Sequence, residues 1–392
     1  MTKPLIYFDN AATSFPKPNS VYCAHDEYLR SAGNPGRGAH DLALNSARTI
    51  FEARMSVAQF LGCENSERVI FTPGCTYSIN MVLHGLQFQR GDCIVTGALE
   101  HNAVMRPLKE LQKKLGLTII TLPYASKGIV DPSALEKVLD SSQPRLCVFA
   151  DASNVTGERI PTESVSAICA AHQVPLLIDA AQTAGAEANC LRYPGVTYWA
   201  APGHKGLLGA PGVGLLVVRG DKQLLPFVCG GTGSSSEALE MPAAFPDRLE
   251  PGTLAGPAIA ALGAGVDFIH KTGANAIADH EHSLAHEFRQ WCFSKSWIKV
   301  VGNSFTNKRS APQSEAAPVV SFLMERLSPD RVADILNTEY NIAVRPGLHC
   351  AAQAHTALDT LKHGLVRVSF GFCNTHDELS GLCDALGKIN NC

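Results

Sequence analysis

Short apolar runs alternate with longer segments of helical periodicity through much of the chain. The runs are rich in Val, Ile, Leu and Phe and nearly continuous, which is typical of strands buried on both faces. They predict strands over residues 68–72, 93–96, 117–122, 146–150, 174–179 and 213–218. The intervening spacing predicts helices over 77–86, 103–114, 132–140 and 162–172. This alternation predicts an α/β fold with a mostly parallel sheet covered by helices.

The two ends of the chain follow a different pattern. A short apolar run at 5–8 precedes helices that are predicted over 19–31 and 41–61. Towards the C-terminus, strands are predicted over 319–324, 341–344 and 365–370, and helices over 257–271, after Ser328 and after Thr375, where Glu378 completes a capping box. We therefore expect a large domain of residues 15–260 and a smaller α+β domain formed by residues 1–14 and 261–392.

Polar residues gather where the predicted strands end. They are Thr76, His101, Asn154, Asp179 and Gln182. Ligands of open α/β sheets bind outside the carboxyl ends of the strands, so these residues predict a binding site. The sequence Gly74-Cys75-Thr76, between a strand and a helix, is typical of an anion site at a helix N-terminus. A plain strand–helix turn is the alternative, because no complete phosphate-binding motif is present.

One lysine stands among glycines and apolar residues, in the segment Gly203-His204-Lys205-Gly206. Charged side chains are rarely buried without a partner. A buried lysine here would have a lowered pKa and a free lone pair for a Schiff base. The alternative is a surface turn whose lysine faces water, since clusters of glycine and proline are first of all turn signals.

The C-terminal part offers a second reactive group. Cys350 follows a glycine turn, adjoins His349 and comes five residues after Arg345. Positive neighbours favour the thiolate form of a cysteine, whereas the alternative is one more buried cysteine among the 13 of this chain. Arg367 lies within an apolar strand. Its partner would be a substrate carboxylate or a structural Asp or Glu.

Composition excludes several classes of function. The chain has 392 residues and a net charge of −3, which gives no basic surface for nucleic acid. No apolar run approaches the roughly 18 residues that a membrane span needs, and no secretory signal is recognisable, so we expect a cytoplasmic protein. The cysteines are scattered without a C-x-x-C pair, so neither a disulfide framework nor a metal site is expected.

Together these residues suit pyridoxal 5′-phosphate attached to Lys205. Its phosphate would lie at a helix start, its pyridine nitrogen would face a carboxylate, and its phenolic oxygen would face an amide. A histidine could stack on its ring and move protons. The corresponding residues are Gly74, Cys75, Thr76, His204 and Thr253 for the phosphate, Asp179 for the nitrogen, Gln182 or Asn154 for the oxygen, and His101 for the ring.

These motifs resemble those of the class V aminotransferase superfamily of fold-type I pyridoxal-phosphate enzymes, and within it the cysteine desulfurases. The Asp…Gln…His-Lys set is specific to the superfamily. The Arg-x-Gly-x-His-Cys-Ala segment is similar to that of the group containing SufS-like enzymes and selenocysteine lyases. The matching segments, in the family's order, are 9–13, 34–40, 71–80, 100–102, 153–157, 178–182, 203–206, 250–253 and 345–351.

The resemblance implies a homodimeric sulfurtransferase that converts L-cysteine to L-alanine. In such an enzyme Lys205 would carry the cofactor and move the substrate's α-proton, and Cys350 would take the sulfur as a persulfide for an acceptor protein. Arg367 and Asn154 would hold the substrate carboxylate. Arg345 and Ala11 would be further substrate-binding residues, and Thr253 would reach the cofactor phosphate of the other subunit.

The sequence departs from the family pattern in three places. Leu254-Ala255 replaces the usual Pro-Asn, Leu348 replaces a frequent second histidine, and Ala351-Ala352-Gln353 replaces Ala-Pro-Leu. The preference between cysteine and selenocysteine therefore stays open. The alternatives on the same scaffold are a selenocysteine lyase, another C–S lyase or an aminotransferase. An alternative of another class is a non-catalytic sulfur-relay or scaffold protein, which the presence of Lys205 disfavours.

Overall fold

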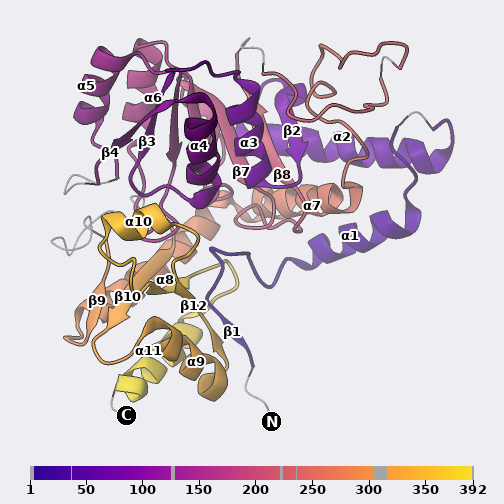
Figure 1. Cartoon of the computed structure of the whole chain (residues 1–392). Helices are drawn as coiled ribbons and strands as arrows, with labels where there is room; N and C mark the ends of the chain where they lie inside the picture. Colours follow the sequence, from indigo (N-terminus) through magenta and orange to yellow (C-terminus); the bar gives the residue numbers. More distant parts are fainter. Residues whose placement is uncertain are drawn as a thin grey trace.

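The centre of the molecule is a seven-stranded sheet with the strand order β2-β8-β7-β6-β5-β3-β4 (Figure 1). The structure is a computed structural model that describes residues 4–36, 38–124, 129–220, 224–234, 236–302 and 316–390. The strands are β2 (Val69–Thr72), β3 (Cys93–Gly97), β4 (Thr118–Leu122), β5 (Leu146–Ala150), β6 (Leu176–Asp179), β7 (Val196–Pro202) and β8 (Gly214–Val218). Only the two pairings of β8 are antiparallel. The predicted mostly parallel α/β sheet is confirmed.

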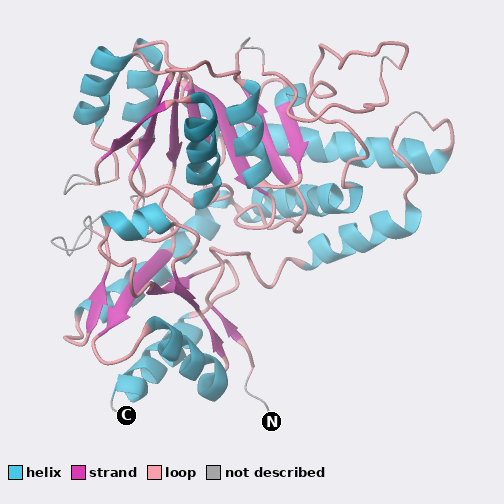
Figure 2. Cartoon of the chain, in the orientation of Figure 1, coloured by secondary structure: helices cyan, strands magenta, loops and turns pink. Residues whose placement is uncertain are grey.

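Helices cover both faces of this sheet, which explains why its strands are continuously apolar (Figure 2). On β7, for example, Tyr198 and Ala200 join the core under one face, and Trp199 and Ala201 join the core under the other. One face carries α3 (Cys75–Gly85) and α4 (Asn102–Leu115). The other carries α2 (Asp41–Leu61), α5 (Pro132–Ser142), α6 (Thr162–Ala171) and α7 (Gly256–Thr272), and α1 (Asn19–Ser31) packs on α7.

A smaller antiparallel sheet lies beside the large one, with the order β12-β13-β10-β9. Its strands are β9 (Ile298–Val300), β10 (Val319–Met324), β12 (Arg345–Gly347) and β13 (Leu365–Ser369). The helices α8 (Ala274–Phe293), α9 (Pro329–Tyr340) and α11 (His376–Asn390) share its core, and α10 (Ala352–Ala357) precedes β13. The N-terminal strand β1 (Ile6–Tyr7) pairs with β11 (Ile342–Ala343), so both ends of the chain belong to this part (Figure 1). The domain division at residue 260 stays a prediction, and α7 runs across it.

Several sequence predictions need correction. Helix α3 begins at Cys75 rather than at residue 77, and β6 begins at Leu176 rather than at residue 174. The strand predicted over 341–344 is shorter, because only Ile342–Ala343 form β11, and β12 begins after the predicted range, at Arg345. The capping box is confirmed, because the Glu378 amide donates to Thr375 Oγ1 (3.2 Å) and the Thr375 amide donates to Glu378 Oε2 (3.0 Å).

A half-buried glutamate on α8 gives the stability of this fold a pH dependence. Glu281 accepts a hydrogen bond from the Phe372 amide, yet burial raises its pKa from 4.5 to about 8. Between these values the folded chain binds more protons than the unfolded chain, so the free energy of unfolding should fall as the pH rises from about 4.5 to about 8. We expect Glu281→Gln to have a higher Tm than the wild type at pH 8, and an equal Tm near pH 4.5.

The measurement is thermal unfolding of both proteins across this pH range. Glu110→Gln, at an exposed position of α4, is the matched control and should show no pH-dependent difference. A Tm difference between Glu281→Gln and the wild type that stays constant from pH 4.5 to pH 8 would contradict the prediction.

Candidate active site

The carboxyl ends of the parallel strands meet at one edge of the large sheet, where a cavity of about 580 Å³ opens. All of the residues predicted to contact the cofactor line it, except Thr253. They are Gly74, Cys75, Thr76, His101, Asn154, Asp179, Gln182, His204 and Lys205. Because they follow β2, β3, β5, β6 and β7, the sheet topology alone accounts for their convergence.

Lys205 lies in the turn that joins β7 to its antiparallel neighbour β8. Backbone packing at this turn is so close that side chains would not fit. A Cβ on Gly206 would lie 2.2 Å from the Ala184 carbonyl oxygen, and one on Gly214 would lie 2.6 Å from the Gly74 Cα. The glycines therefore bring the Lys205 turn against the start of α3. The structure places Lys205 in the cavity wall, not in a turn that faces only solvent.

The surroundings of Lys205 favour its neutral form. Burial lowers the pKa of Lys205, the negative charge of Asp179 opposes this, and the positive charges of Arg367 and Arg345 lower it further. Asp179 is 3% exposed at the end of β6. Its Oδ1 accepts hydrogen bonds from the Ala181 amide (3.0 Å) and from Cys75 Sγ (3.4 Å). A lysine with a lowered pKa near a fixed carboxylate suits Schiff-base chemistry.

The start of α3 offers an anion site. Gly74 is the N-cap, and the first amides of a helix have no partner within the helix. His204 Nδ1 is buried and has no hydrogen-bond partner among the described residues. Burial, with help from the charges of Lys205 and Lys17, lowers the pKa of His204 to about 4. His204 is therefore neutral at pH 7, and an orphaned ring nitrogen next to a helix N-terminus fits a phosphate group.

His101 is held as a neutral ring at the N-cap of α4. Its Nδ1 accepts a hydrogen bond from the Ala103 amide (3.0 Å), so a neutral ring carries its proton on Nε2. Burial lowers the pKa of His101, although Asp179 opposes the shift. The ring is thus oriented by the backbone and can exchange a proton at Nε2.

Two amide side chains connect the cavity to other parts of the chain. Gln182 Nε2 donates to the Ala11 carbonyl (3.2 Å), and Asn154 Nδ2 donates to the His349 carbonyl (2.7 Å). Asn154 Oδ1 is buried without a partner among the described residues. The cavity is therefore linked through Ala11 to the N-terminal segment and through His349 to the Cys350 loop.

Cys350 is exposed and does not line the cavity. The Asn102 amide donates to its carbonyl (2.8 Å), which ties its loop to the start of α4 beside His101. His349 and Cys350 both have left-handed backbone angles, with φ values of 49° and 56°, and such strain is often kept at functional sites. Cys350 is thus not one of the buried structural cysteines.

Only one of the two predicted positive neighbours of Cys350 is charged in the structure. Arg345 Nη2 lies 3.9 Å from Cys350 Sγ. His349, however, is 3% exposed, and burial lowers its pKa to about 3, with Arg367 contributing. It is therefore neutral at pH 7, and its Nε2 donates a hydrogen bond to the Arg345 carbonyl (3.0 Å). Arg345 is the positive group at this thiol.

Arg367 is 1% exposed and already has protein partners. Its Nη2 donates to Asp9 Oδ1 (2.7 Å), and its Nη1 donates to the Asn154 carbonyl (3.1 Å). The structural ion pair that the sequence left open is therefore formed, with Asp9 as the carboxylate. Arg367 Nε is buried without a partner among the described residues and stays available to an anion.

Thr253 is exposed at the surface of the single chain. Its loop is anchored by Glu250, which receives a bidentate ion pair from Arg54 (2.7 and 2.8 Å) and a hydrogen bond from the Phe71 amide (2.6 Å). The loop is thus fixed at its base and presents Thr253 outwards. Arg37, within the matching segment 34–40, lies outside the described residues.

Neither a helix that could span a membrane nor a metal-binding cluster occurs in the described part of the chain. No helix there combines the length and the apolar character needed to cross a membrane. The same residues contain no group of three or more His, Cys, Asp or Glu side chains placed to hold a metal ion.

Residues 6–382 match the family model described as aminotransferase class-V. The chain belongs to the class V aminotransferase family. Two relatives are similar over almost their whole length. A probable cysteine desulfurase of Methanothermobacter thermautotrophicus is 33% identical, over 98% of this chain and 94% of that protein. A probable cysteine desulfurase of Pyrococcus abyssi is 32% identical, over 99% of this chain and 95% of that protein.

A solved structure of the same family confirms the fold. The apo structure of a cysteine desulfurase from Thermococcus onnurineus matches with a TM-score of 0.90 and 31% identity, and the match covers 99% of this chain and 95% of that one. The expected resemblance of this class V chain to the desulfurases is therefore confirmed, and with it the membership of a pyridoxal-phosphate-dependent family.

Proposed function

We propose that this chain is a pyridoxal-phosphate-dependent cysteine desulfurase that stores sulfur as a persulfide on Cys350. One observation carries the proposal. Lys205, Asp179 and the start of α3 line one cavity, while the exposed Cys350 is hydrogen-bonded through its carbonyl to the start of the helix that His101 caps. Full-length relatives that are described as cysteine desulfurases support the same activity.

The residues of the cavity fit pyridoxal phosphate. The orphaned His204 Nδ1 and the amides that begin α3 suit its phosphate, Asp179 suits its pyridine nitrogen, and the Lys205 amine suits its aldehyde. When bound, the group supplies a Schiff-base linkage and an electron sink for the substrate carbon. Asp179 would hold the pyridine nitrogen of the bound group in its protonated form, and His101 would lie against its ring.

Each side chain at the site has a separate role in the reaction of L-cysteine. Arg367 and Asn154 bind the substrate carboxylate, with Arg345 and Ala11 near the substrate. The Lys205 amine takes the proton from the substrate Cα. The Cys350 thiolate, with Arg345 beside it, attacks the substrate sulfur. The bond between the substrate Cβ and its sulfur breaks, and a sulfur–sulfur bond to Cys350 forms. The electron pair of the broken bond stays with Cβ, which is protonated, and the proton held by Lys205 returns to Cα, which gives alanine.

The test is a single-turnover reaction of the cofactor-loaded protein with L-cysteine. We expect one alanine per chain, and the mass of one extra sulfur atom on the peptide that contains Cys350. Parallel reactions with selenocysteine and cystine define the substrate preference. Pyruvate and sulfide in place of alanine, without any sulfur on Cys350, would contradict the proposal and favour a C–S lyase.

We also propose that the active form is a homodimer. Three large apolar residues, Leu44 (54% exposed), Phe51 (58%) and Met55 (45%), follow one another on one face of α2. The surface segment around Thr253 lies outside the cavity of its own chain, so a second copy would bring Thr253 to a cofactor phosphate. Sedimentation equilibrium of the wild type and of Phe51→Glu tests this, because a monomeric wild type would exclude it. A sulfur-acceptor protein is the proposed further partner.

A further inference from the structure

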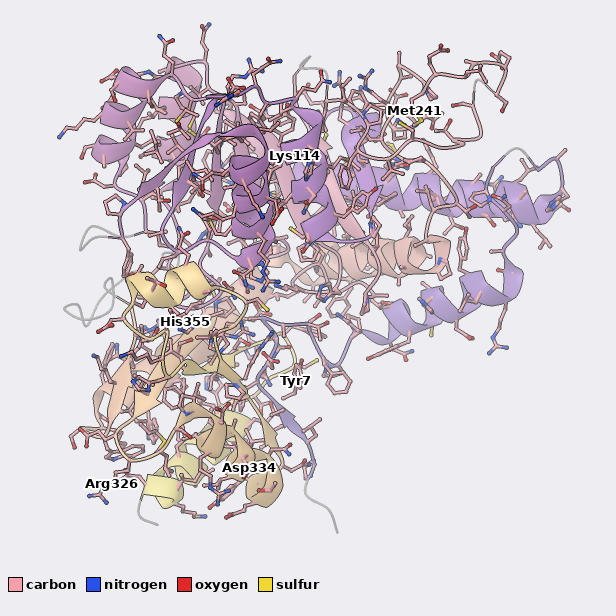
Figure 3. All side chains as sticks on the ribbon, in the orientation of Figure 1. Tyr7, Lys114, Met241, Arg326, Asp334 and His355 are labelled. Atoms are coloured by element: carbon pink, nitrogen blue, oxygen red, sulfur yellow. The ribbon has the colours of Figure 1, made fainter. Side chains whose placement is uncertain are left out.

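The N-terminal segment from Tyr7 to Lys17 reaches from the small sheet to the Lys205 turn. Tyr7, labelled in Figure 3, donates to the carbonyls of Asp9 (3.2 Å) and Thr13 (3.1 Å), which braces the segment internally. The segment then contacts the turn of Lys205 through hydrogen-bond donors of Thr13, Ser14 and Lys17. Hydrogen bonds therefore fix this N-terminal segment against the Lys205 turn.

These donors converge on the two carbonyls that flank the Lys205 Cα. The His204 carbonyl accepts from the Ser14 amide (3.1 Å), from Thr13 Oγ1 (3.0 Å) and from Lys17 Nζ (2.6 Å). The Lys205 carbonyl accepts from Ser14 Oγ (3.0 Å), and Ser14 Oγ accepts in turn from Lys17 Nζ (2.6 Å). The ammonium of Lys17 is the only charged group in this set, and a charged donor is about twice as strong as a neutral one.

The placement of Lys17 is costly for a lysine. It is half-buried, and burial lowers its pKa to about 8. Its hydrogen bonds within the described residues go to neutral oxygens, not to a carboxylate. The other titratable and charged groups around it are Tyr22, whose hydroxyl accepts from the Lys17 amide (3.0 Å), His204 and Lys205. Because these partners are neutral, ion pairing does not explain why Lys17 is placed here.

We propose that Lys17 is a positioning residue for Lys205, whose backbone it fixes through the His204 carbonyl so that the Lys205 amine points into the cavity. The inference rests on the proposed role of Lys205. Lys17 itself does not line the cavity. Its effect should therefore fall on bond formation by the Lys205 amine and not on the binding of phosphate and ring.

The experiment compares two ligands that share phosphate and ring. Pyridoxal phosphate can bond to Lys205, whereas pyridoxamine phosphate has no aldehyde and cannot. The variants are Lys17→Met, which removes the charge, and Lys17→Arg, which keeps it. Lys113→Met, at an exposed position of α4, is the matched control. The readouts are the rate of covalent capture at Lys205, trapped with borohydride and located by peptide mass spectrometry, and the dissociation constant of pyridoxamine phosphate.

We expect Lys17→Met to slow capture by about tenfold, the loss of one charged hydrogen bond, with recovery in Lys17→Arg and no change in Lys113→Met. The affinity for pyridoxamine phosphate should stay within about twofold of the wild type. Unchanged capture in Lys17→Met would overturn the inference, and so would an equal loss for both ligands, which indicates a general structural role. If the wild type itself captured no pyridoxal phosphate at Lys205, the proposed function would fail instead.

Discussion

Lys205→Ala should abolish the visible absorbance of the bound cofactor and reduce cysteine turnover by at least about 10²–10⁴-fold, the range for loss of general acid–base catalysis alone. The physical reason is that Lys205 is the amine of the cavity and has a pKa lowered by burial. Without it, the cavity keeps its anion site and Asp179 but has no group that can bond to an aldehyde or take the Cα proton.

The measurement combines an absorbance spectrum of the protein mixed with pyridoxal phosphate and an alanine assay. Lys205→Arg is an informative companion, because it keeps the charge near Asp179 but lacks a neutral amine at accessible pH. Lys113→Ala controls for loss of a surface lysine. A Lys205→Ala protein with wild-type absorbance and turnover would show that another amine carries the cofactor.

The central sheet could be predicted from the sequence because its signal is local. Strands β2, β3, β5, β6 and β8 are short, mostly apolar runs between turns, because burial on both faces leaves few positions for polar residues. The edge strand β4 is partly exposed and carries two threonines. β7 escaped the prediction because its apolar residues are mostly Tyr198, Trp199 and two alanines, not the Val, Ile, Leu and Phe that mark the other strands. Its pairing with β6 on one side and with β8 on the other holds it in the sheet.

Most of the candidate site was also predictable, since parallel strands bring their carboxyl ends together whatever lies between them. The contacts between the two halves of the molecule could not be predicted from the sequence. The Asp9–Arg367 pair joins residues separated by 358 positions, and nothing near Asp9 in the sequence indicates its partner. Lys17, between two prolines, has the local pattern of a surface turn, and only the fold brings it to the His204 carbonyl.

The charge of His349 beside Cys350 also could not be predicted from the sequence. The sequence suggested two positive neighbours for the thiol, but charge on a histidine depends on burial, which depends on tertiary packing. In the fold His349 packs beside His355, with 5.6 Å between ring centroids, and is neutral. The residue type determines which groups can react, and the surroundings determine whether a titratable side chain is charged.

Cys350→Ala should remove the persulfide and reduce sulfur transfer from L-cysteine on the order of 10³-fold, because loss of a nucleophile removes a step and does not merely weaken it. Absorbance of the bound cofactor should be unchanged, since Cys350 does not line the cavity. This separation of cofactor binding from sulfur transfer is the distinctive expectation for Cys350, in contrast to Lys205, where both are lost together.

Peptide mass spectrometry and an alanine assay on the same samples measure the effect of this substitution. Cys23→Ala removes another exposed cysteine, on α1, and should behave as the wild type. Full alanine production by Cys350→Ala, with the sulfur passed directly to an added thiol, would show that Cys350 is not the nucleophile. Pyruvate and sulfide in place of alanine would mean that the carbon–sulfur bond breaks by elimination, which describes a C–S lyase. Because Arg345 is the positive group beside Cys350, Arg345→Gln should slow persulfide formation less than Cys350→Ala does, since the nucleophile remains and only its charged neighbour is lost.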